Sequence, residues 1–277
     1  QGIPQCTATH NFAGYPGHNI VDLPPDGQTT VKAEVGGFFG ESIIHYWTLR
    51  WREPVGEVGL KLMLPEGELE FGKEPQDMTS GDHVVSYTGV SMSSRGTQMA
   101  LLFVGRVGPD GNWQPLMPAT YQIALTSLDG TGGEVDVWLN DENGYLLGSA
   151  LSETTAKGTL AYPSTADSAI GTGALSANLD TGSPLGDLTF YSGQGPRIDG
   201  ELGIDVVAPA DGLAADSGSP WAVFPSMTLA SGTSGSLPQV TGVVALLKQL
   251  EPDISADQVT ERLQAGALED GFTDVVP

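Results

Sequence analysis

The stretch that says most about the fold is Gly232–Gly242, which reads GTSGSLPQVTG. Ser234 lies on a tight, glycine-flanked loop, just before an apolar run that begins at Pro238. The apolar residues of this run fall on one helical face, so we predict a helix over Pro238–Leu250. The N–H groups and partial positive charge at a helix start can hold the oxyanion that a nucleophilic serine generates. Taken alone, however, Gly-Thr-Ser is more often an ordinary helix cap.

The stretch resembles the serine motif of the subtilase family, whose usual form is Gly-Thr-Ser-Met-Ala-x-Pro-His-Val-x-Gly. The positions that match are Gly232, Thr233, Ser234, Pro238, Val240 and Gly242. Two positions depart from the motif: Gly235 replaces the methionine, and Gln239 replaces a histidine that is not the catalytic one. Because of this context, the nucleophile is the better interpretation of Ser234.

Further blocks stand in the family's order across residues 158–268. The segments 163–174, 190–196 and 205–209 are similar to the family's P-A-T-A…V-G-A, F-S-S-x-G-P and D-V-x-A-P-G blocks. A second helix is expected over Ser255–Ala265, where Ser255 and Gln258 form a capping-box pair. The resemblance implies an α/β fold, the C-terminal part of a subtilisin-like parallel-sheet domain.

The resemblance also implies an asparagine that donates a hydrogen bond to the oxyanion. The candidate is Asn11, although His10 stands where the family has glycine, and the alternative is a turn residue capping its own backbone. Thr9, His10 and Thr233 are then expected to be substrate-binding. His18 follows at the distance seen in relatives such as the clostridial germination proteases, which carry a jelly-roll insert after this turn.

Period-two alternation marks the middle of the chain. Tyr121, Ile123 and Leu125 alternate with polar or small neighbours, and turn signals such as Pro109-Asp110-Gly111 separate the runs. We therefore predict three parts: a subtilase segment over residues 1–27, an inserted antiparallel β-sandwich or jelly roll over 28–157, and the subtilase C-terminal part over 158–277. Trp47, Trp51 and Trp138 of the insert are expected in its core rather than on a carbohydrate-binding platform.

Two members of a serine protease triad are missing from the predicted site. The four histidines (His10, His18, His45 and His83) lie outside any His-Gly-x-His setting, so we expect structural roles for them. The Asp180-Thr181-Gly182 stretch looks like the family's aspartate motif, but it lies in a variable loop and is better explained as a β-turn. We expect the catalytic Asp and His to come from an absent N-terminal part, and this chain alone to be inactive.

Composition restricts the partners. The 277 residues carry a formal net charge of −23, which disfavours nucleic acid and anionic membranes. The single cysteine, Cys6, excludes an internal disulfide, and the N-terminus does not look like a signal peptide, so we expect it to begin at a cut. No cofactor is expected, although family resemblance makes calcium conceivable; the Asn140–Gly144 stretch is better explained as a hairpin turn than as a calcium loop.

These observations support a serine endopeptidase acting on peptide or protein substrates through Ser234, secreted or extracytoplasmic. The chain's own N-terminal fragment is the expected partner, since it would carry the Asp and the His. The alternative is a non-catalytic pseudoprotease or protein-binding module whose β-rich insert recognises a partner.

Overall fold

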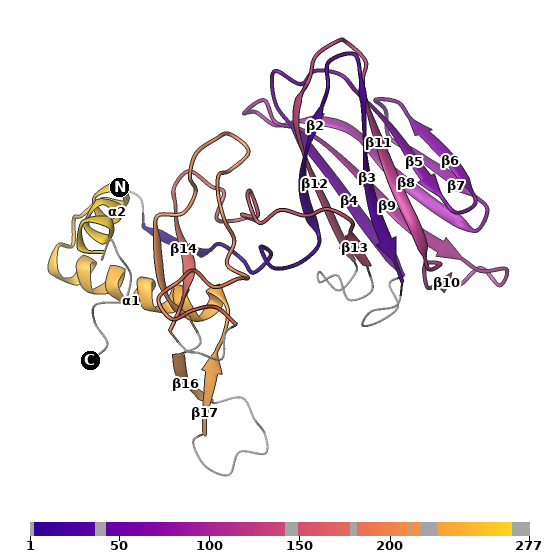
Figure 1. Ribbon diagram of the computed structural model, residues 1–277. Helices are drawn as coiled ribbons and strands as arrows, with labels where there is room; N and C mark the ends of the chain where they lie inside the picture. Colours follow the sequence, from indigo (N-terminus) through magenta and orange to yellow (C-terminus); the bar gives the residue numbers. More distant parts are fainter. Residues whose placement is uncertain are drawn as a thin grey trace. The chain divides into compact units, whose positions relative to one another are not determined.

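The structure is a computed structural model that describes residues 3–36, 43–141, 149–177, 182–210, 212–216 and 226–267. The chain divides into two compact units, residues 15–155 and residues 1–14 with 156–277 (Figure 1). The N-terminal boundary differs from the predicted one at residue 27, because β2 (His18–Leu23) pairs along its length with β12 (Gly133–Asp141). The turn-rich composition around β2 concealed this strand.

The unit of residues 15–155 consists of two antiparallel sheets. The seven-stranded sheet has the order β2-β12-β4-β9-β8-β7, with β10 added on β9, and the five-stranded sheet has the order β13-β3-β11-β5-β6. In the first sheet, the strands other than β2 and β12 are β4 (Ile44–Trp51), β7 (Gln76–Ser80), β8 (His83–Met92), β9 (Gln98–Val107) and β10 (Trp113–Gln114). The strands of the second are β3 (Gln28–Val35), β5 (Val58–Leu64), β6 (Gly67–Phe71), β11 (Ala119–Ser127) and β13 (Ser149–Leu151).

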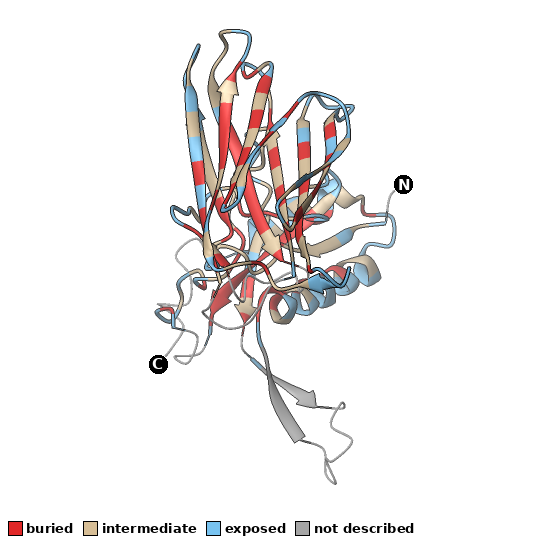
Figure 2. Ribbon diagram, turned by 90° about the vertical axis from the view of Figure 1, so that its right-hand side faces the viewer, coloured by how far each residue is buried: buried red, intermediate tan, exposed pale blue. Residues whose placement is uncertain are grey.

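Alternating burial explains why these runs form a sandwich. Every second residue of β5 is buried, and the same pattern marks β4 and most of β3, so each sheet has one face in the core (Figure 2). Both sheets contribute to one hydrophobic cluster. Trp47 and Trp51 are fully buried in it, and Trp138 is 8% exposed. These three tryptophans therefore pack inside this unit, whereas Trp113 on β10 is 52% exposed.

The other unit is built on a three-stranded parallel sheet of order β1-β14-β15. Its strands are β1 (Gln5–Ala8), β14 (Ala169–Ser176) and β15 (Val206–Ala210), and a separate antiparallel pair consists of β16 (Gly212–Asp216) and β17 (Ser226–Ala230). All but the first residue of the central strand β14 are buried, as expected for a strand covered on both faces. β1 and β14 lie more than 150 positions apart in sequence, so the sandwich interrupts this sheet between its first two strands.

Two helices complete this unit. α1 (Thr233–Leu250) packs on β1, β14 and β15 through Val240 and Val244, and α2 (Ala256–Gly266) joins the same core through Val259. β1 contributes Cys6, and burial raises the pKa of its thiol. Of the helices in the described part of the chain, none is long and apolar enough to cross a membrane.

The first helix begins earlier than predicted. α1 starts at Thr233 rather than Pro238, which lies inside the helix, because acceptors from outside the helix satisfy its first N–H groups. These acceptors come from parts of the chain far away in sequence, so a local pattern could not reveal them. The second helix follows the expectation: Ser255 caps it, and Ser255 and Gln258 form the full capping box.

Candidate active site

Ser234 lies at the N-terminus of α1 and is exposed to solvent. The residue before the helix, Gly232, has φ 80° and ψ 177°, a backbone conformation that is essentially restricted to glycine. The first turn of the helix contains no acidic residue. The partial positive charge of the helix start is therefore available to an anion that develops at Ser234.

Asn11 reaches this loop from a position 222 residues earlier in the chain. Its Oδ1 accepts two hydrogen bonds from Thr233, one from the N–H at 2.9 Å and one from the Oγ1 hydroxyl at 3.0 Å. Because both donors occupy the amide oxygen, the amide nitrogen points the other way. The Nδ2 of Asn11 lies beside Gly232, at 2.8 Å from the place a Cβ would take there. The amide oxygen of Asn11 is thus occupied by Thr233, and its amide nitrogen lies beside Gly232.

In the part of the chain that the structure describes, the N–H groups around the first turn of α1 have acceptors, with the exception of the Ser234 N–H. The Gly232 N–H donates to the Tyr191 hydroxyl at 3.2 Å, and the Gly235 N–H donates back to the Gly232 carbonyl at 2.9 Å. With the Thr233 N–H bound to Asn11, the Ser234 N–H remains without an acceptor within the described residues. Two hydrogen-bond donors, the Ser234 N–H and the Asn11 amide nitrogen, therefore both lie at this loop.

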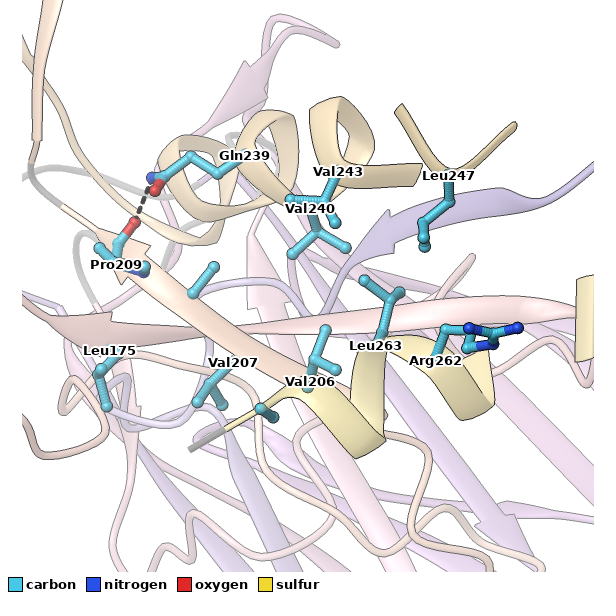
Figure 3. A pocket seen from close by; sticks show the side chains of 13 residues that line it. Leu175, Val206, Val207, Pro209, Gln239, Val240, Val243, Leu247, Arg262 and Leu263 are labelled. Carbon is cyan, nitrogen blue, oxygen red and sulfur yellow. Dashed lines mark hydrogen bonds between the residues drawn. The ribbon is translucent and has the colours of Figure 1, made fainter. Parts of the chain in front are cut away.

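The two departures from the family motif lie next to each other in the structure. The amide nitrogen of Gln239 donates to the Gly235 carbonyl at 3.0 Å. It also donates to the Pro209 carbonyl at 2.6 Å (Figure 3). Gln239 thereby ties the first turn of α1 to the end of β15. The loss of a side chain at Gly235 is accompanied by a direct tether between the helix and the sheet.

The predicted substrate-binding residues differ in accessibility. Thr9 is fully buried and Thr233 is 1% exposed, with its hydroxyl engaged by Asn11. His10 is partly exposed, has a positive φ of 69°, bonds to the Tyr162 carbonyl at 2.8 Å and stacks on the ring of Phe12. Thr9 and Thr233 are buried and His10 is partly exposed; contact of these three residues with a substrate stays a prediction.

A substitution at Gly232 tests this construction. We expect Gly232→Ala to lower the free energy of unfolding by roughly 1–3 kcal/mol, because the backbone conformation excludes a side chain and the new Cβ would meet Asn11. Gly242 in the same helix is the matched control: a Cβ added there meets nothing, so Gly242→Ala should stabilise by about 0.5–1 kcal/mol. Urea unfolding of both variants gives the comparison, and equal effects would contradict the assigned loop geometry.

None of the four histidines bonds to Ser234 within the described residues. His18, His45 and His83 belong to the sandwich unit and are buried, and His45 and His83 bond to the hydroxyls of Ser149 and Tyr121 at 2.8 and 2.7 Å. Burial raises the pKa of Tyr121 to about 12, so this hydroxyl stays protonated. The expected structural roles of the histidines agree with these contacts. Residues 180 and 181 of the rejected aspartate motif lie outside the described residues, as do residues 142–144 of the predicted hairpin turn.

His18 belongs to a hydrogen-bonded network with Asp136 and Arg50. Its Nε2 lies 2.8 Å from Asp136 Oδ1, and the other carboxylate oxygen accepts from Arg50 Nη2 at 2.7 Å. The Arg50 guanidinium also lies over the ring of Trp138, 5.6 Å from its centre. One carboxylate thus holds two basic side chains of β2 and β4.

The same histidine closes the sandwich where the chain enters and leaves it. The Thr155 N–H donates to the His18 carbonyl at 3.0 Å, and the His18 Nδ1 lies 3.2 Å from the Thr155 carbonyl. Nearby, the Leu151 N–H donates to the Pro16 carbonyl at 2.7 Å. Residues near the two ends of the sandwich unit are therefore hydrogen-bonded to each other.

A separate groove of about 420 Å³ lies between β15, α1 and α2 (Figure 3). Its lining is mostly apolar, with Val206, Val243 and Leu263 turned into it. Neither Asn11 nor Ser234 lines it, so the groove is distinct from the serine site. Among the described residues, no three His, Cys, Asp or Glu side chains meet in a way that could hold a metal ion, so none of them is assigned to calcium.

Comparison with known proteins gives three findings. A sequence profile described as the subtilase family (Peptidase_S8) matches residues 134–274, just over half of the chain. Pyrolysin of Pyrococcus furiosus is 47% identical over 60 residues, which are 22% of this chain and 4% of pyrolysin. The structure of the Clostridium perfringens CspB protease superposes on 98% of this chain with a TM-score of 0.74 at 18% identity. The chain spans 54% of that structure, so it corresponds to about half of a chain of this fold.

Proposed function

The chain belongs to the subtilase family, and from this we propose that it is the serine-bearing part of an endopeptidase that cleaves peptide bonds through an acyl-enzyme at Ser234. The observation that carries the proposal is the meeting of Asn11 and the Ser234 loop across 222 positions, with one donor from each. The fold shared with the CspB protease supports it. Peptides or proteins are the substrates that the family implies.

In the proposed reaction, the Ser234 Oγ attacks the carbonyl carbon of the scissile peptide bond while its proton passes to a histidine base. The carbonyl oxygen becomes an oxyanion that accepts from the Ser234 N–H and the Asn11 amide. The C–N bond then breaks, and the leaving amine takes the proton from the histidine. The same histidine then deprotonates a water molecule, which attacks the carbonyl carbon of the ester. The bond between this carbon and the Ser234 Oγ breaks, and the histidine returns the proton to Ser234.

The histidine base and the aspartate that orients it come, in this proposal, from a part of the protein upstream of this chain. β1 supports such a partner, because it is an edge strand of the parallel sheet and pairs only with β14 among the described strands. An open edge offers backbone donors and acceptors to a further strand. We propose that the upstream part adds its strands there and places the histidine beside Ser234.

A fluorophosphonate probe tests the proposal. We expect covalent labelling at Ser234 in protein that includes the upstream part, with complete loss in Ser234→Ala. Ser231→Ala is the matched control, since Ser231 is an exposed serine three residues earlier and its removal should leave labelling intact. The 277-residue chain alone should react far more slowly, because loss of a triad leaves only about 10³–10⁴-fold acceleration over water.

A second candidate function follows if the intact, folded protein is not labelled. The sandwich of residues 15–155 would then be a binding module on a non-catalytic subtilase scaffold. Its independent core and the bonded ends favour a unit that can act by itself. Labelling of Ser234 at a rate comparable to that of active serine proteases would exclude this alternative.

A further inference from the structure

We propose that Tyr191 is a positioning residue for the serine site, which fixes the two oxyanion donors, the Ser234 N–H and the Asn11 amide, relative to each other. This proposal rests on the function proposed above. Sequence patterns indicate no such role for Tyr191, which stands in the F-S-S-x-G-P-like block where the family has a serine. In the structure it bonds to both halves of the site, through its hydroxyl to one and through its carbonyl to the other.

The hydroxyl of Tyr191 acts on the serine loop. α1 has no side-chain cap of its own, and the residue before it, Gly232, is buried. The Gly232 N–H therefore needs an acceptor from another part of the chain, and the Tyr191 hydroxyl supplies it at 3.2 Å. With Gly232 held by Tyr191 and Thr233 held by Asn11, the N–H groups on the N-terminal side of Ser234 are both fixed. The direction of the Ser234 N–H follows from these two anchors.

The backbone around Tyr191 acts on the asparagine turn. The Ala13 N–H donates to the Tyr191 carbonyl at 3.2 Å, and the Gly193 N–H donates to the His10 carbonyl at 2.8 Å. These two bonds bracket Asn11 on either side. Gly193 comes so close that a Cβ there would lie 2.1 Å from the Thr9 carbonyl oxygen. The segment 191–193 thus fixes the turn of Asn11, while the phenol of the same segment fixes the serine loop.

In this arrangement the hydroxyl oxygen of Tyr191 affects the rate of acylation. Removing the Tyr191 hydroxyl leaves the buried Gly232 N–H without its acceptor, and the N-cap is then free to shift. A displacement of the loop misaligns the Ser234 N–H relative to Asn11, although neither donor has been altered. Because Tyr191 does not touch the reacting atoms in this proposal, its loss should lower the rate of acylation and leave substrate binding nearly unchanged.

The test uses Tyr191→Phe, which keeps the ring and removes only the hydroxyl. Amide exchange followed by NMR should show the Gly232 N–H exchanging at least about tenfold faster in the 277-residue chain. Tyr46→Phe is the matched control, because it removes a tyrosine hydroxyl in the sandwich and should leave Gly232 protected. Unchanged exchange at Gly232 would overturn the proposal whether or not the protein is a protease.

The second measurement is made on protein that includes the upstream part. Fluorophosphonate labelling of Ser234 should slow about tenfold in Tyr191→Phe, with kcat reduced by a similar factor and KM within twofold for a peptide ester. Faster exchange at Gly232 with an unchanged labelling rate would reduce Tyr191 to a helix cap and overturn its positioning role. Absence of labelling in the wild-type protein would instead refute the proposed function, and the exchange result would still decide whether Tyr191 holds the loop.

Discussion

Replacement of Asn11 by alanine is expected to lower kcat about 10²–10³-fold in protein that carries the whole triad. This is the range found when one oxyanion donor is removed from subtilisin, itself a subtilase. The bonds from Thr233 to the amide oxygen hold the side chain of Asn11 in place, and its amide nitrogen is the group that donates to the oxyanion in the proposed reaction. KM should change little, because the donor acts on charge that develops in the transition state.

Asn11→Asp separates the donor from the anchor. An aspartate can still accept from the Thr233 N–H and hydroxyl, so the fold and its melting temperature should be preserved. It cannot donate, however, and its charge would face the developing oxyanion. We expect Asn11→Asp to be at least as slow as Asn11→Ala in steady-state peptide hydrolysis. An active Asn11→Asp variant would show that Asn11 only anchors the loop.

Asp136→Ala is expected to lower the free energy of unfolding of the sandwich by about 3 kcal/mol, because it leaves two basic side chains without their shared carboxylate. The side chain of His18 is 1% exposed and that of Arg50 is 24% exposed, so water can replace only part of the lost interaction. Thermal and urea unfolding followed by tryptophan fluorescence would measure the loss, since Trp138 lies against both basic groups.

Asp22→Ala is the matched control for that experiment. Asp22 is a carboxylate on β2 of the same sheet, but it is exposed. Its removal should change stability by less than about 0.5 kcal/mol. A loss at Asp136 no larger than the loss at Asp22 would show that the network contributes nothing beyond surface charge.

Local signals in the sequence were sufficient for much of the fold. Period-two alternation identified strands such as β5 and β11, and the Ser255–Gln258 pair identified the start of α2, because these patterns depend on neighbours in the chain. The start of α1 was misplaced because its N–H groups bond to Asn11 and Tyr191. β2 was missed for a similar reason: its partner β12 comes more than 100 residues later.

The candidate site likewise contains residues that the sequence predicted and residues that it did not. Motif resemblance selected Ser234 and Asn11 as a pair, and the structure brings them to one loop. Tyr191 carried no local signal, since the residue types around it do not show that its hydroxyl meets a glycine 41 positions later. The link from His18 to Asp136 was hidden likewise, because it spans 118 positions. Contacts between residues far apart in the sequence, rather than local patterns, therefore complete the serine loop and, separately, the His18–Asp136 pair of the sandwich.

The bonds that join His18 to Thr155 and Pro16 to Leu151 have a consequence for the entropy of the chain. An unstructured insertion between β1 and β14 would impose a loop-closure cost that grows with the logarithm of its length. A folded insertion whose ends are hydrogen-bonded to each other lowers this cost, because the effective loop between β1 and β14 is then short whatever the size of the insertion. Once the sandwich has folded, only residues 9–14 and 156–168 act as the connection between β1 and β14, and any event that melts the sandwich restores the long connection between these strands.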